Sequence, residues 1–190
     1  SSSAPQDDLD LPTIEDINLA SGQKTAGAGP SAAATGRIVT VHTDTLEIKI
    51  DLEGGDVVGA ALKNYPKTLD DPRDPFVLLE RNALRTYIAQ SGLVGPDGID
   101  QSQRARYRAS QEVYTQTGGE PLEVVIDYAG ADSLLQVSKH FRFEPGSHTI
   151  GVQYSVTNRS AQVAQVTPFV QIKRDSSPAP ATGDSGMGMQ

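Results

Sequence analysis

The segment from Arg37 to Pro66 constrains the fold most, because an alternating apolar pattern runs into a glycine pair and out again. Successive side chains of a strand point to opposite faces, so strict alternation is typical of a half-buried β-strand. Gly54 and Gly55 can adopt the positive φ values that a tight turn needs, and a second apolar run follows Asp56. The pattern predicts antiparallel strands with one buried face, which carries Leu46, Ile48, Ile50 and Leu52.

The same alternation recurs along the chain, separated by turn residues, and it predicts an all-β fold. A Gly- and Pro-rich stretch at 91–100 predicts a compact loop. Burying four aliphatic side chains contributes about 6 to 12 kcal/mol, whereas ordering a strand of about eight residues costs about 8 to 16 kcal/mol. One hairpin is therefore insufficient, and we expect a twisted antiparallel β-sandwich. The predicted strands are 37–43, 45–52, 56–65, 76–80, the region of Tyr87, 107–115, 122–128, 133–143, 150–156 and 163–173.

Composition divides the chain into three parts. Residues 1–35 are rich in Ser, Ala, Gly, Pro and Asp, which is typical of a disordered polar linker. Residues 36–174 hold the strand pattern and form the predicted β-sandwich domain. Residues 175–190 are rich in Ser, Pro and Gly and are predicted to be a loop or tail.

The charge balance excludes several partners. The formal net charge is -8 and the isoelectric point is near 4.8, which argues against nucleic acid and an anionic membrane surface. The chain has no cysteine, so thiolate metal sites and cysteine nucleophiles are excluded. The sequence contains no nucleotide-binding motif and no apolar stretch long enough to span a bilayer.

Candidate chemical groups are few, and the sequence assigns no catalytic, cofactor-binding or metal-binding residue. The three histidines, His42, His140 and His148, are not at metal-ligand spacing, and we expect them at the surface. The acidic pairs Asp7/Asp8 and Asp70/Asp71 fall in linker or turn sequence, where solvation explains them.

Two further sequence patterns each have two interpretations. Arg104, Arg106 and Arg108 alternate with small or aromatic residues, which predicts three guanidinium groups on one side of a strand. They are suited to an acidic partner, but a charged outer face or a protected edge strand is the favoured explanation in a chain this acidic. The segment 158–160 has the form of an N-glycosylation acceptor and is also a natural turn.

Several short sequence motifs occur in this order along the chain: GGDV at 54–57, Tyr65-Pro66, the strand at 76–80, YIAQSGL at 87–93 and GPDG at 95–98. In this order, over residues 36–173, they resemble the large periplasmic domain of the YidC family of bacterial membrane protein insertases. The resemblance implies a supersandwich similar to galactose mutarotase-like domains, on the periplasmic face of the inner membrane. It also implies a domain that continues past Gln190, so the sandwich is expected to be incomplete at its C-terminal end.

Within the resemblance, the matched residues are structural. Gly54 and Gly55 are expected in the turn, and Leu78 and Leu79 in the core. The family's membrane-embedded groove lies outside this chain, so no insertion residue is carried over.

The resemblance implies a noncatalytic insertase domain that contacts Sec translocon accessory subunits and nascent membrane proteins. A carbohydrate-binding or aldose-epimerase-like sandwich is the alternative, with His42 or His140 as the acid or base. A third hypothesis is an edge that recruits an extended peptide, near Arg106 or Tyr107.

Overall fold

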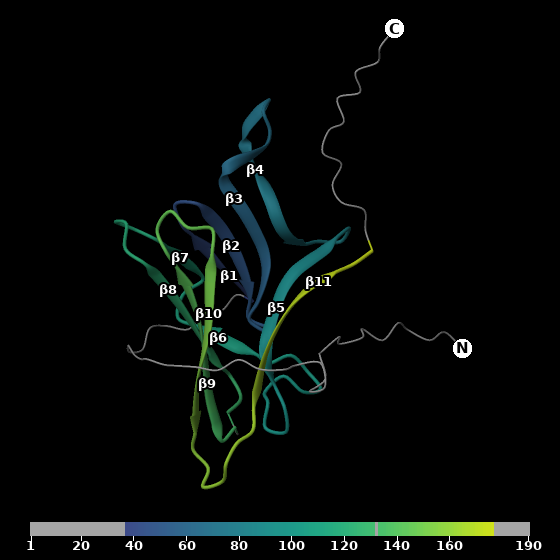
Figure 1. The fold of residues 1–190 in the computed structure, drawn as a ribbon, viewed down its shortest axis with the longest axis vertical. Coiled ribbons are helices and arrows are strands. Elements are labelled where there is room, and N and C mark those ends of the chain that lie inside the picture. Colours follow the sequence, from purple (N-terminus) through teal and green to yellow (C-terminus); the bar gives the residue numbers. More distant parts are fainter. Residues whose placement is uncertain (1–36, 132, 177–190) are drawn as a thin grey trace, which may run out of the picture.

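The computed structural model describes residues 37–131 and 133–176, and this part of the chain folds into strands without a helix (Figure 1). The all-β prediction is confirmed. The strands are β1 (Ile38–His42), β2 (Leu46–Asp51), β3 (Asp56–Thr68), β4 (Asp71–Arg81), β5 (Thr86–Val94), β6 (Tyr107–Ala109), β7 (Val113–Thr115), β8 (Leu122–Tyr128), β9 (Leu135–Phe143), β10 (Ile150–Asn158) and β11 (Thr167–Arg174).

These strands form two sheets, as expected for a β-sandwich. The larger sheet has seven strands in the order β11-β5-β4-β3-β2-β1-β7, and the smaller has four in the order β10-β9-β8-β6. Pairing is antiparallel except between β1 and β7, which run parallel. Strands β10 and β11 are therefore end strands, one in each sheet (Figure 1).

The core lies between the sheets and follows the alternation seen in the sequence. In β9, buried and more exposed residues alternate along the whole strand. Its inward side chains pack with those of β1 and β2 in one apolar cluster, in which Val39, Ile48 and Phe141 are fully buried. Burying this cluster is the main stabilising contribution to the fold.

The segment predicted as one strand at 107–115 is two strands in different sheets. β6 pairs with β8 in the smaller sheet, whereas β7 pairs with β1 in the larger sheet. Residues 110–112 carry the chain from one sheet to the other. The prediction of a single strand was wrong because long-range pairing, and not local alternation, decides where this segment breaks.

The predicted loop at 91–100 is also partly wrong, because β5 continues to Val94. Gly92 lies inside this strand where a side chain has no room: an added Cβ would lie 2.4 Å from Asp100 Oδ2 and 2.6 Å from Phe169. A glycine inside a strand often marks such a close approach. Strand β11, in turn, begins at Thr167 and not at 163.

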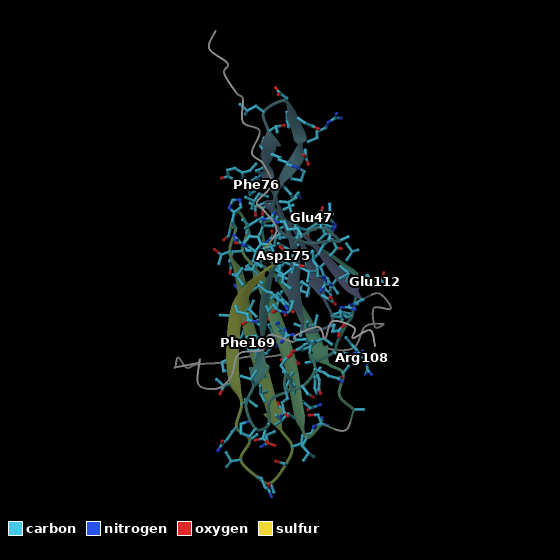
Figure 2. All side chains as sticks on the ribbon, turned by 90° about the vertical axis from the view of Figure 1, so that its right-hand side faces the viewer. Glu47, Phe76, Arg108, Glu112, Phe169 and Asp175 are labelled. Atoms are coloured by element: carbon cyan, nitrogen blue, oxygen red, sulfur yellow. The ribbon has the colours of Figure 1, made fainter. Side chains whose placement is uncertain are left out.

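Strands β3 and β4 are longer than predicted and project from the body as a two-stranded arm (Figure 1). Figure 2 shows Phe76 where this arm leaves the sheet. Leu69 at its tip is 93% exposed.

The predicted sandwich range, 36–174, contains all the described strands. The linker predicted at 1–35 and all but two residues of the predicted tail lie outside the described residues.

Candidate functional site

A group of charged side chains is buried against β3 and β5. Arg104 donates from Nη2 to Asp56 Oδ1 at 2.5 Å and from Nη1 to Asp100 Oδ1 at 2.8 Å. Its side chain is 7% exposed, and those of Asp56 and Asp100 are 4% and 0% exposed. Buried charges are tolerated when they are paired and hydrogen-bonded, and one guanidinium here serves two carboxylates.

Both carboxylates have further donors that fix their positions. Gln90 Nε2 donates to Asp56 Oδ2 at 2.9 Å, and the backbone N–H of Leu93 donates to Asp100 Oδ2 at 3.0 Å. Ala105 N–H donates to Asp100 Oδ1 at 3.1 Å. These bonds fasten the segment 95–106 onto the end of β5.

Lys139 approaches the same place from β9 of the other sheet and is fully buried. Its Nζ donates to three backbone carbonyl oxygens, those of Gly55 at 2.7 Å, Ser91 at 3.1 Å and Gly54 at 3.3 Å. The ammonium also lies 5.4 Å from the centre of the Phe141 ring and 5.3 Å from that of Tyr154. Its three donors thus have backbone acceptors, and aromatic faces flank it.

Burial is the main cause of the pKa shifts in this group. It lowers the pKa of Lys139 to about 7, although Asp56 opposes the shift. It raises the pKa of Asp56 against the opposing effect of Arg104, and it raises the pKa of the Tyr107 and Tyr154 hydroxyls. Desolvation disfavours each charged form, which explains all four directions.

This arrangement holds the two sheets together. Lys139 and Asp100 are both fully buried, so the group is not accessible to a substrate. Within residues 37–131 and 133–176, no group of three metal-ligating side chains occurs. A contact surface of this domain therefore lies elsewhere.

The open side of the sandwich, between β10 and β11, is such a surface. On β10, Val152 and Val156 pair with Phe141 and Val137 of β9, so they lie on the inward face. They are nevertheless 43% and 40% exposed.

On β11, Val170 and Ile172 pair with Ser91 and Ala89 of β5, and Ala89 pairs with the core residue Val57. This face is also inward, yet Val170 is 80% and Ile172 58% exposed. We call Val152, Val156, Val170 and Ile172 the open-edge residues. They form an uncovered continuation of the core at two sheet edges.

The histidines are not brought together. His42 lies 3.6 Å from Glu47 on the larger sheet, and His140 lies 2.8 Å from Glu123 on the smaller sheet. The His148 side chain is exposed and contacts the Tyr65 ring edge to face. His140 is less accessible than predicted, since its side chain is 13% exposed.

The prediction that Arg104, Arg106 and Arg108 share one face was wrong for Arg104. Arg106 and Arg108 are exposed, but Arg104 precedes the strand and is buried with Asp56 and Asp100. Of the structural residues, Gly54 and Gly55 have φ of 86° and 60°, as the turn requires. Leu79 is buried as expected, whereas Leu78 is 47% exposed.

Sequence reasoning missed Lys139, Asp56 and Asp100 as buried residues. A signal for Lys139 was present, because it occupies the inward position between Val137 and Phe141 in an alternating strand. For Asp56, the tight turn at Gly54 and Gly55 explained the segment without drawing attention to the acid that follows.

The fold, with these residues, defines the class of the protein as a two-sheet β-sandwich domain with a buried charged group. Comparison with known proteins shows the family. Residues 38–189 match the family model of the YidC periplasmic domain. The chain is 43% identical over 160 residues to the membrane protein insertase YidC of Marinomonas sp. (strain MWYL1), covering 83% of this chain and 28% of that protein. It is 38% identical over 168 residues to that of Stutzerimonas stutzeri (strain A1501), covering 88% of this chain and 30% of the relative.

A third relative, the membrane protein insertase YidC of Shewanella amazonensis (strain ATCC BAA-1098 / SB2B), is 43% identical over 166 residues, which cover 85% of this chain and 30% of that protein. The chain belongs to the YidC periplasmic domain family, and the domain is periplasmic. It spans less than a third of the length of the curated relatives it matches. Among the described residues, no helix is long and apolar enough to cross a membrane.

Proposed function

We propose that this chain is a noncatalytic part of a multi-pass membrane protein insertase in the bacterial inner membrane, and that it serves as a scaffold for other proteins. The relatives are named as membrane protein insertases. The proposed partners are the accessory subunits of the Sec translocon and nascent membrane proteins.

One observation carries the proposal of a contact surface: the open-edge residues are apolar and inward-facing, yet exposed. End strands present unpaired backbone groups, and natural proteins usually protect them. A strand edge with apolar side chains beside it is suited to an extended polypeptide, because the backbone provides hydrogen bonds and the side chains provide apolar area. Among the described strands, β10 and β11 are at the ends of their sheets and carry such apolar side chains.

The test is site-specific photocrosslinking in the intact insertase in cells, with the crosslinker at Val170 and, separately, at Val152. We expect adducts with translocon accessory subunits and, during synthesis of an inserted protein, with the nascent chain. Val113 is the matched control, because it lies on β7, the opposite end strand of the same sheet, and is 53% exposed. Adducts confined to the insertase's own chain would overturn the proposal.

A sugar-binding role is the second candidate, and one groove favours it. A groove of about 490 Å³ on the smaller sheet has Ser138, Ser155, Thr157, Asp127 and Arg159 among its lining residues. Hydroxyl and carboxylate groups are suitable hydrogen-bond partners for a polyol. Calorimetry against a panel of monosaccharides and disaccharides tests this role, and the absence of heat at millimolar sugar would exclude it.

A further inference from the structure

The larger sheet contains a gap in its hydrogen-bonded ladder. Strand β5 pairs with β4 only at Thr86 and Tyr87, and then lies beside β3, where Val57 and Ala89 are the one paired position among the described residues. We call the region from Gly54 to Val57 and from Ala89 to Gly92 the seam. Backbone carbonyls buried in such a gap need donors from elsewhere.

Two side chains supply these donors, and they share two backbone acceptors. Lys139 Nζ donates to the carbonyl oxygens of Gly54 and Ser91. Arg104 Nη2 donates to the same two oxygens, at 3.1 Å each. A carbonyl oxygen has two lone pairs and accepts two such bonds.

The two donors reach the seam from opposite faces of the sheet. Tyr154, which contacts Lys139, donates its hydroxyl to Ser91 Oγ. Arg104 lies over the Phe169 ring, and Phe169 and Asp100 face the neighbouring residue, Gly92. Adjacent residues of a strand face opposite sides, so Lys139 acts from the interior of the sandwich and Arg104 from under the segment 95–106.

We propose that Lys139 and Arg104 form a two-sided clamp on the seam, so that separation of the two sheets at β9 and release of the segment 95–106 occur as one event. Losing Lys139 leaves the Gly54 and Ser91 carbonyls held from one side only. The two carbonyls then shift away from Arg104, which lengthens its bonds to them, and the Asp100 bonds that hold the segment loosen with it. The loss of Lys139 thus affects residues 95–106 through the shared carbonyls, and no direct bond between Lys139 and this segment is needed.

The experiment is hydrogen exchange, read by mass spectrometry, on the intact insertase in nanodiscs. In Lys139→Met we expect amide exchange to rise about tenfold in peptides covering the seam and, by a similar factor, in peptides covering 95–106. The control is Lys63→Met, because Lys63 Nζ also donates to a backbone carbonyl, that of Thr43 at 2.6 Å, but away from the seam. Lys63→Met is expected to leave exchange at the seam and at 95–106 unchanged.

A rise confined to β9 and the seam, with 95–106 protected as in the unmodified protein, would overturn the clamp. A second measurement needs no variant: exchange of the unmodified insertase is followed at increasing, sub-denaturing urea. We expect the seam and 95–106 to open with the same free energy and the same urea dependence, as parts of one cooperative unit. Two separate opening free energies would equally overturn the proposal.

Discussion

Arg37 and Asp51 are joined by a bidentate ion pair at the edge of the core. Nε of Arg37 lies 2.8 Å from Oδ1 of Asp51, and Nη2 lies 3.0 Å from Oδ2. The Asp51 side chain is fully buried and Arg81 also donates to it, whereas the Arg37 side chain is 59% exposed. Asp51 thus lies at the end of the β1–β2 pairing. The guanidinium groups that pair with its charge lie on the solvent side.

The first prediction concerns this pair. Burial alone would raise the pKa of Asp51, but bonds from Arg37, the Glu53 backbone and Arg81 hold it below its ordinary value. A lowered folded pKa contributes stability above the unfolded pKa of about 4, and this is lost as pH falls through the folded pKa. We expect Asp51→Asn to cost about 1 to 3 kcal/mol at pH 7.

Urea unfolding of the purified chain between pH 7 and pH 3 measures this effect. The difference between Asp51→Asn and the unmodified chain should shrink as pH falls below about 4. Glu53→Gln is the control, because Glu53 also pairs with Arg37 but its side chain is 38% exposed, and its effect should stay under about 1 kcal/mol. A constant difference across the pH range would refute the assignment.

The second prediction concerns the turn at Gly55. Its φ is +60°, and an added Cβ would lie 2.9 Å from Ile126 Cδ1 and 3.0 Å from Lys139 Cδ. We expect Gly55→Ala to cost about 1 to 2 kcal/mol in backbone strain and about 1 to 3 kcal/mol in crowding. The control is Gly118→Ala, with φ of +70° and nothing within 4 Å of the added Cβ, which should show the strain alone. Equal losses of unfolding free energy for the two variants would contradict this explanation.

The third prediction compares two neighbours on β11. Phe169 is 6% and Val170 80% exposed, and Figure 2 shows Phe169 on its strand. In the purified chain, Phe169→Ala should cost about 3 kcal/mol or more, because it leaves a cavity under Arg104. Val170→Ala should change stability by less than about 0.5 kcal/mol. A large loss in Val170→Ala, measured by urea unfolding, would mean that this edge is already covered within the chain.

Much of the strand pattern was predictable, because alternation is a local signal and one face of most strands is buried. The strands at Ile38–His42, Leu46–Asp51 and Leu122–Tyr128 lie where the pattern places them. The division of 107–115 was not predictable in the same way, because it depends on pairing with β8 and β1 in two different sheets. The length of the arm likewise depends on pairing between Thr68 and Asp71 across prolines that normally weaken a strand.

The buried charges were predictable only in part. Asp100 and Arg104 are four residues apart, which is a local signal for a pair. The acceptors of Lys139 are not local: Ser91 lies 48 residues away and Gly55 lies 84 residues away. A lysine at an inward strand position indicates a buried cation, but only the packed sheets reveal that its partners are backbone carbonyls at a gap between strands.

The last prediction concerns the pH dependence that Lys139 confers. Its folded pKa is about 7, below its ordinary value of 10.5, chiefly because of burial. Asp56 and Asp100 raise this pKa and Arg104 lowers it, and the hydroxyls of Tyr107 and Tyr154 lie in the same group. Between pH 7 and about 10, Lys139 is largely neutral in the folded chain and protonated in the unfolded chain. The unfolded chain therefore binds more protons, and the free energy of unfolding should rise with pH.

The free energy of unfolding should rise by at most about 1.4 kcal/mol per pH unit from this one group. The neutral amine still has two N–H donors for the seam carbonyls. Urea unfolding of the purified chain at pH 7, 8 and 9 measures the rise. Lys139→Met should remove it, whereas Lys63→Met, which alters an exposed lysine, should leave it unchanged. A pH dependence that is identical in the unmodified chain and Lys139→Met would show that Lys139 remains charged throughout this range in the folded state.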